Sequence, residues 1–212
     1  MSLPSLKLSW NRNMRQEFQE IAPGLFLGSA FSSNNVDQLK TAGITNLVCI
    51  YDSRETRAME NLVAYRKKEA APGLEVFKKH YVEVNVEKKK GFIRAFSKVE
   101  ELLLPACEEA SRVDMSKTLV YCTTGIAVSP PFVVMHLMKR FSWDPVYAME
   151  YVCDRRACVY FTEPAQKAIF KFGSRLSLQA EIENDAKLSN AGHSIRSSKR
   201  KREDSDSDSE ED

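Results

Sequence analysis

A cysteine at position 122 has the surroundings of a reactive thiol rather than those of an ordinary core residue. It ends the β-prone run Thr118-Leu119-Val120-Tyr121, and a loop centred on Gly125 follows before a helix begins near Ser129. A turn of this kind points successive backbone N–H groups inward and adds the positive end of a helix dipole. The expected product is a concave anion site, whose field favours the nucleophilic thiolate form of a cysteine.

The segment from Cys122 to Ser129 resembles the Cys-x5-Arg-Ser loop of the dual-specificity protein phosphatases. The residues of this candidate phosphate-binding loop are Cys122, Thr123, Thr124, Gly125, Ile126, Ala127, Val128 and Ser129. Further segments that resemble the same family, in family order, are Ile21–Gly28, Gly43–Val48 and Tyr151–Arg156. The resemblance covers residues 14–178, and its opening segment Met14–Ile21 is most similar to family members that lack activity.

The resemblance implies an arginine at position 128, where this chain has Val128. In the family that arginine grips two phosphate oxygens with its planar guanidinium, a contact of the strong, charge-assisted class. Valine offers neither a donor nor a charge, and losing one transition-state donor costs on the order of 100- to 1,000-fold in rate. In addition, Tyr121 stands where the family has a histidine before the cysteine.

The general acid of the family, an aspartate after the strand that ends near Val86, is altered as well. The loop here reads Val86-Glu87-Lys88-Lys89-Lys90-Gly91, and alignment places Lys88 at the aspartate's position with Glu87 beside it. Glu87 takes the acid's role if the register slips by one, whereas a lysine needs a strongly depressed pKa to donate there. Three altered groups favour loss of turnover. The surviving Cys122 leaves weak phosphatase activity, or a redox-responsive thiol, as alternatives.

Strands that alternate with helices predict an α/β domain. The resemblance implies its three-layer, cysteine-phosphatase-like form, with a mostly parallel central sheet flanked by helices. Short β-prone runs predict strands at 25–27, 45–50, 81–86 and 118–121. Apolar spacing and stop signals predict helices over 34–42, 54–68, 92–110, 132–137, 144–153 and 163–172. His136 falls in an apolar helix, so a packed rather than a catalytic histidine is expected there.

Composition divides the 212 residues into three parts. Residues 1–13 are expected to form an N-terminal arm and residues 14–178 the phosphatase-like domain. Residues 179–212 are polar and lack a sustained apolar period, which predicts a disordered tail, basic and then acidic. The basic cluster that fits a nuclear import signal is Lys199, Arg200, Lys201 and Arg202. The serines that have an acid three residues later, as suits an acid-directed kinase, are Ser205, Ser207 and Ser209.

The remaining composition points away from other kinds of site. Five scattered cysteines without a Cys-x-x-Cys pair or a secretory signal predict reduced thiols. The chain has three histidines, and neither a metal site nor a cofactor is expected. No apolar run is long enough to cross a bilayer, and no membrane or nucleic-acid partner is expected.

These patterns predict an interaction module rather than an efficient enzyme. We expect a phosphatase-like protein that binds other proteins, phosphorylated kinases among them, and anchors or shields them in signalling. The resemblance implies mitogen-activated kinase signalling as a setting, although no residue here selects the partner or the oligomeric state. The lack of a secretory signal together with the basic cluster predicts a location in cytoplasm and nucleus.

Overall fold

The structure is a computed structural model that describes residues 12–55, 73–108 and 117–203. The chain divides into two units, Met1–Gly173 and Ser174–Asp212. The first unit holds the sheet and nearly all of the described helices, and the second continues the last helix. No helix in these described ranges is long and apolar enough to cross a membrane.

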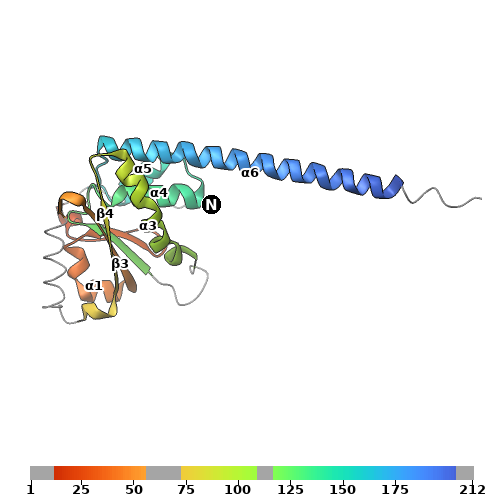
Figure 1. The fold of residues 1–212 in the computed structure, drawn as a ribbon. Coiled ribbons are helices and arrows are strands. Elements are labelled where there is room, and N and C mark those ends of the chain that lie inside the picture. The colour runs from red at the N-terminus through yellow and green to blue at the C-terminus, as the bar shows by residue number, and fades with distance from the viewer. Residues whose placement is uncertain (1–11, 56–72, 109–116, 204–212) are drawn as a thin grey trace, which may run out of the picture. The chain divides into compact units, whose positions relative to one another are not determined.

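A five-stranded sheet organises the first unit, in the order β1-β2-β5-β3-β4 (Figure 1). The strands are β1 (Gln19–Ala22), β2 (Leu25–Ser29), β3 (Ile44–Asp52), β4 (Lys78–Val84) and β5 (Lys117–Cys122). Strand β1 pairs antiparallel with β2, and the other three pairings are parallel. The predicted α/β class with a mostly parallel sheet is confirmed. Strand β1 was not expected from the sequence.

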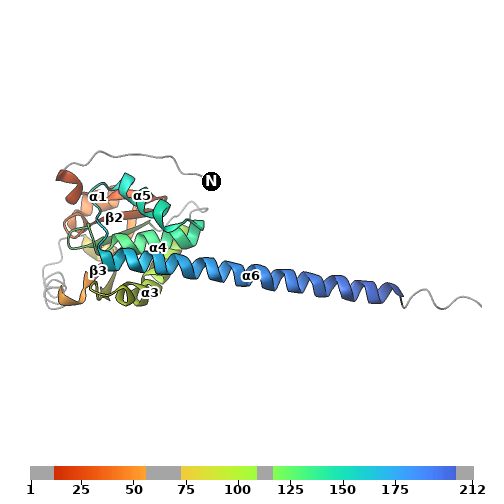
Figure 2. The same ribbon diagram turned by 90° about the horizontal axis from the view of Figure 1, so that it is seen from above.

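Helices cover both faces of the sheet (Figures 1 and 2). Helix α1 (Val36–Thr41) lies on one face, whereas α3 (Lys89–Glu108), α4 (Pro130–Phe141) and α5 (Pro145–Arg155) lie on the other. Short 3-10 turns join these elements: η1 (Arg12–Arg15), η2 (Ser32–Asn34), η3 (Ser53–Glu55) and η4 (Leu74–Val76). Of the helix predicted over 54–68, residues 56–68 lie outside the described residues.

The alternation of side chains along β5 explains why its last two residues behave differently. Leu119 and Tyr121 point toward α1 and pack in one buried cluster with Leu39 and Leu47. Successive side chains of a strand point to opposite faces, so Cys122 faces away from that cluster. Tyr121, the residue before Cys122, is therefore a core residue.

Two boundary predictions need correction. Residues 12–13 were assigned to the arm, but Arg12–Arg15 forms a 3-10 helix. The tail was predicted to be disordered from residue 179, but helix α6 runs without a break from Glu163 to Glu203. No proline follows Pro164, and Ala, Leu, Glu, Lys and Arg recur along the segment, so local helix propensity is high. The prediction considered only the lack of an apolar face. Residues 204–212 lie outside the described residues.

The four parallel strands all end at one edge of the sheet. Strand β2 ends at Ser29, β3 at Asp52, β4 at Val84 and β5 at Cys122, so the loops that follow them meet there. Ligands of open parallel sheets bind at the carboxyl ends of the strands. This edge is consequently the place to look for a site, and it holds the predicted loop.

Candidate functional site: the loop after β5

Cys122 ends β5 with its side chain buried and its sulfur already hydrogen-bonded. The side chain is 1% exposed. The Sγ atom accepts from the backbone N–H of Gly125 at 3.2 Å and from the hydroxyl of Ser129 at 3.2 Å. The Cys122 carbonyl accepts from the N–H of Ala30, which anchors the start of the loop to the end of β2. These two donors fix the position of the sulfur at the base of the loop.

The carbonyl groups of the loop are held from outside, which fixes the direction of its N–H groups. Arg156 Nε donates to the Gly125 carbonyl at 2.9 Å, and Tyr160 N–H donates to the Ile126 carbonyl at 3.0 Å. In a trans peptide the N–H points opposite to the C=O. The N–H groups of Ile126 and Ala127 accordingly point to the other side, into the concave face of the loop. This arrangement is that of a backbone anion site.

Glycine is required at the centre of the loop. Gly125 has φ +68°, a conformation that side chains rarely adopt. A Cβ at this position would lie 2.4 Å from the Gly28 carbonyl oxygen, which is far inside van der Waals contact. The close approach of β2 to the loop thus depends on the absence of a side chain.

Helix α4 begins at Pro130, immediately after Ser129. Pro130 and Pro131 do not delay this start. Proline suits the first helical position, where its missing N–H would have no partner and its fixed φ is already helical. The loop therefore opens onto the positive end of a full-length helix.

Arg156 supports the loop from beneath and is fully buried at 0% exposure. Besides the Gly125 carbonyl, its guanidinium donates to the Glu17 carbonyl at 3.1 Å and to Gln19 Oε1. Burial lowers the pKa of Arg156, and the neighbouring Cys158, Cys122 and Glu17 act in the opposite direction. Arg156 is therefore a structural residue.

The guanidinium of Arg156 does not stand in for a residue-128 arginine. Its remaining nitrogen, Nη2, has no hydrogen-bond partner and would lie 2.7 Å from a Cβ built on Gly125, on the underside of the loop. The neighbouring Arg155 stacks its guanidinium on the Tyr151 ring at 3.4 Å, so it too is a structural residue.

The other loop residues form an open and uncharged surface. Thr123 and Thr124 are exposed, whereas Ile126, Ala127 and Val128 are partly buried. Among these, Val128 occupies the position at which the resemblance implies a guanidinium. The structure places every predicted loop residue in one turn between β5 and α4.

Sequence reasoning missed a group of charged side chains beside the loop. Glu55, at the end of η3, accepts a hydrogen bond from the Thr123 hydroxyl at 3.0 Å. The preceding residue, Arg54, binds Asp52 through two nitrogens at 2.5 and 2.7 Å and Glu87 at 3.2 Å. Only the meeting of β3, β4 and β5 at one sheet edge brings these residues together. No local pattern in the sequence signals it.

Glu87, the candidate acid, lies at this edge but is paired and open to solvent. Its side chain is 61% exposed, and its carboxylate binds Arg54 Nη1. A general acid must lie within hydrogen-bonding reach of the leaving group, whereas the structure shows this carboxylate bound to Arg54. Lys88 is also exposed.

Asp52 is the buried member of this group. Burial acts to raise the pKa of its carboxyl, but the hydrogen bonds and charge of Arg54 outweigh it and leave the pKa below its ordinary value. Asp52 therefore remains ionised and fixes Arg54 in place.

His136 and the cysteines other than Cys122 are packing residues. Burial in α4, together with the charges of Arg140 and Lys139, lowers the pKa of His136 to about 4. Cys49 lies in the core cluster, and burial raises the pKa of the Cys153 thiol. Cys122, Cys153, Cys158 and Cys49 are all free thiols. The side chain of Cys107 lies outside the described residues.

The tail residues are placed only in part. Lys199, Arg200, Lys201 and Arg202 lie in the helical backbone of α6. The three candidate phosphorylation serines, Ser205, Ser207 and Ser209, lie outside the described residues.

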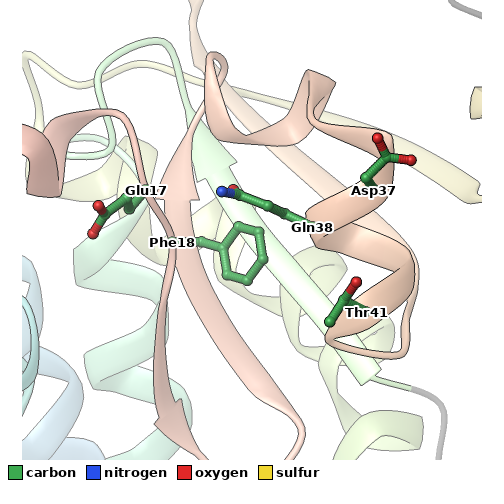
Figure 3. A pocket seen from close by; sticks show the side chains of 5 residues that line it. All are labelled: Glu17, Phe18, Asp37, Gln38 and Thr41. Atoms are coloured by element: carbon green, nitrogen blue, oxygen red, sulfur yellow. The ribbon is translucent and has the colours of Figure 1, made fainter.

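A separate open groove of about 400 Å³ lies between α1 and the segment that leads into β1 (Figure 3). Its lining residues are Glu17, Phe18, Asp37, Gln38 and Thr41. The Phe18 ring faces Gln38 and Thr41, while Glu17 and Asp37 point away from it. The groove shares no lining residue with the loop, and no reactive group lies in it.

Comparison with known proteins supports the geometry. The mouse and human serine/threonine/tyrosine-interacting proteins are each 29% identical over 164 residues, 74% of this chain. The aligned part spans 66% of the length of those relatives. No family model matches the chain.

Solved structures agree with the fold. The human tyrosine phosphatase-like serine/threonine/tyrosine-interacting protein superposes with a TM-score of 0.60 at 24% identity, covering 76% of this chain and 97% of that one. A mouse putative dual-specificity phosphatase complexed with zinc tungstate superposes with a TM-score of 0.59 at 22% identity, covering 82% and 96%.

Proposed function

Because this chain belongs to the dual-specificity phosphatase family, we propose that it is a catalytically impaired member that binds phosphorylated proteins. Phosphorylated kinases are the partners that we infer, and the protein would anchor or shield them in signalling. Its phosphatase-like domain is homologous to the serine/threonine/tyrosine-interacting proteins.

The observation that carries this proposal is a loop that keeps its anion-binding backbone but has Val128 where the resemblance implies a guanidinium. The inward N–H groups of Ile126 and Ala127 and the start of α4 can hold phosphate oxygens. Position 128 carries an isopropyl group, and Arg156 lies beneath the loop rather than over Cys122. Binding by backbone donors survives in such a site. Stabilisation of the transferring phosphoryl group, which needs a charged clamp, does not.

The alternative is a weakly active phosphatase that uses Cys122 as its nucleophile. Two hydrogen bonds to Cys122 Sγ favour this reading, since they hold the sulfur in a fixed position at the base of the loop. The surroundings of Glu87 oppose it, because an exposed carboxylate paired with Arg54 makes a poor proton donor at neutral pH.

We further propose a cytoplasmic and nuclear location. The basic cluster Lys199–Arg202 supports it, because such clusters are read by the import machinery. Phosphorylation of Ser205, Ser207 or Ser209 would add negative charge beside that cluster and weaken its recognition.

A binding and turnover experiment tests the proposal. A doubly phosphorylated kinase activation-loop peptide is titrated into the wild-type protein and followed by calorimetry, while phosphate release is measured in the same mixture. We expect saturable binding that the unphosphorylated peptide does not reproduce. We also expect a release rate equal to that of Cys122→Ser, which removes the nucleophile and keeps the size of the side chain.

Two outcomes would contradict the proposal. Phosphate release that depends on Cys122 and proceeds at ordinary enzymatic rates, about 1 s⁻¹ or faster, would favour the weakly active enzyme. Equal binding of the phosphorylated and unphosphorylated peptides would show that the loop plays no part in recognition.

A further inference from the structure

The hydrogen bond between Glu55 and Thr123 places a carboxylate at the entrance of a loop whose backbone donors suit an anion. Glu55 Oε2 accepts from Thr123 Oγ1 at 3.0 Å, across 68 residues of sequence. We propose that Glu55 is a specificity-determining residue: it weakens binding of phosphate alone and favours phosphorylated segments that carry lysine or arginine beside the phosphorylated residue. The inference rests on the proposed function, because it concerns which ligand the same loop accepts.

Glu55 competes directly with a bound phosphate for the hydroxyl of Thr123. Thr123 follows Cys122 immediately, so its hydroxyl lies at the rim of the anion site. A hydroxyl has a single hydrogen to donate, and Glu55 occupies it. A phosphate that approaches the rim meets a charge of its own sign and finds that donor already taken. Like charges a few ångströms apart repel by roughly 1 kcal/mol in water and by more where solvent is excluded.

The second step is the charge of the described side chains that are bonded to Arg54 or to Thr123 at this edge of the sheet. Asp52, Glu55 and Glu87 carry three negative charges and Arg54 carries one positive charge, which leaves a net charge of −2 in this hydrogen-bonded group. Arg54 is engaged by Asp52 on one side and Glu87 on the other. Its positive charge is thus largely balanced before any ligand arrives.

The third step is the lack of compensation within the described part of the loop. Val128 brings no charge, and Arg156 is directed at the underside of Gly125. A phosphorylated segment with a neighbouring lysine or arginine supplies the missing cation itself and can pair it with Glu55. Such complementarity raises selectivity more than raw affinity.

The test begins with tungstate, an oxyanion of phosphate's shape. We expect Glu55→Gln to bind tungstate about tenfold more tightly than the wild type, because one repulsive charge is removed. Glu101→Gln is the matched control. It makes the same change of net charge on an exposed position of α3, twelve residues and about 18 Å along the helix from its start. The gain should shrink as salt is raised, because Glu55 is partly open to solvent.

Glu55→Asp separates charge from contact. The shorter side chain keeps the carboxylate but withdraws it from the Thr123 hydroxyl. We expect tungstate affinity within about threefold of the wild type, because most of the repulsion remains. Affinity equal to that of Glu55→Gln would mean that the hydrogen bond, and not the charge, sets the barrier, and would overturn the electrostatic argument.

The selectivity is tested with two phosphopeptides that differ only by arginine or alanine next to the phosphorylated residue. The wild type should prefer the arginine peptide by about tenfold, and Glu55→Gln should lose most of that preference. An unchanged preference in Glu55→Gln, or tungstate binding no tighter than in Glu101→Gln, would overturn the inference.

Failure of this inference is distinguishable from failure of the proposed function. If the wild type binds phosphopeptide without turnover and Glu55→Gln changes nothing, only the role of Glu55 is wrong. If the wild type releases phosphate through Cys122, the proposed function fails, whereas the tungstate comparison still reports on Glu55.

Discussion

At the scale of single residues, Arg156 and Val128 have different effects on the loop after β5. Arg156 holds the loop in shape by binding the Gly125 carbonyl from beneath. Val128 stands where the resemblance implies a guanidinium and offers an anion no charge. None of the described residues from Thr123 to Ser129 is charged, so anion binding there would depend on the backbone N–H groups and the loop hydroxyls.

Restoring the guanidinium should restore affinity. Val128→Arg adds a bidentate donor at a partly buried position facing the loop, and we expect tungstate to bind at least tenfold more tightly than to the wild type. Calorimetry measures the effect. Val128→Met, which is long but uncharged, serves as the control and should leave the affinity near that of the wild type. Equal affinity of both variants would show that residue 128 does not reach the ligand.

Removing the buried guanidinium should destabilise the whole first unit. Arg156→Met leaves the Gly125 carbonyl, the Glu17 carbonyl and Gln19 without their donor, so we expect a loss of about 3 kcal/mol in the free energy of unfolding. Urea denaturation followed by circular dichroism measures it. The exposed Arg94→Met should change the stability by less than about 0.5 kcal/mol. A small loss in Arg156→Met would contradict the supporting role.

At the scale of elements, the positive end of the α4 dipole is directed at the loop. The same helix buries His136, and burial disfavours the protonated form of its imidazole. His136 is buried among the apolar residues of this helix, with a pKa of about 4 against 6.5 in an unfolded chain. Between these two values the unfolded state binds more protons than the folded state, so stability rises with pH. The destabilisation grows as pH falls from 6.5 to about 4 and then levels off.

The burial of His136 in α4 predicts that the free energy of unfolding depends measurably on pH. Each pKa unit corresponds to about 1.4 kcal/mol, so His136 should account for a loss of about 3 kcal/mol on acidification from pH 7 to pH 4. Urea denaturation at several pH values should show a shallower dependence in His136→Gln than in the wild type. Met135→Leu, a volume-conserving change in the same helix that removes no titratable group, should retain the wild-type slope. Identical slopes for the wild type and His136→Gln would contradict the burial argument.

A second element-scale prediction concerns the start of α5. Asp144 caps this helix by accepting from the N–H groups of Val146 and Tyr147, both at 3.0 Å. Asp144→Ala should cost about 1 kcal/mol in the free energy of unfolding, whereas Asp144→Asn should cost less because asparagine caps almost as well. Thermal denaturation ranks the two variants. The reverse order would mean that the aspartate acts through another contact.

At the scale of the whole molecule, the buried core belongs to the first unit. Every buried hydrophobic side chain among the described residues lies between Met14 and Ile169. We expect a chain that ends at Glu183 to unfold at the same urea concentration as the full chain while losing helical circular dichroism signal. A lower midpoint in the shortened chain would show that residues after 183 contribute to the fold.

Local sequence patterns predicted several strands of the sheet. They did not predict the length of α6 or the contacts between distant residues at the loop. Apolar runs bounded by glycines predicted β2 and β3, and the stretch before Cys122 predicted β5, because burial on both faces leaves a clear signature. The extension of α6 was missed because the polar composition and the lack of a sustained apolar period were taken to indicate disorder, although local helix propensity is high there. The pairing of Glu55 with Thr123 was missed because it is set by sheet topology and not by sequence spacing.

The place of the loop after β5 was predictable because its strand, cysteine, central glycine and helix start follow one another within a few residues. Its contacts with distant residues were not. The orientation of Arg156 needed the structure, since its partners Glu17 and Gln19 lie more than 130 residues away in sequence. Its burial beneath the loop separates a supporting arginine from a ligand-binding one.

The central claim is that Cys122 lies in a phosphate cradle that cannot complete phosphoryl transfer, and trapping the covalent intermediate tests it most directly. Wild type, Val128→Arg and Cys122→Ser are each incubated with an excess of an aryl phosphate, quenched in acid and analysed by intact-protein mass spectrometry. The account predicts no phosphocysteine above the Cys122→Ser background in the wild type. Accumulation of phosphocysteine at Cys122 in the wild type within seconds would contradict it.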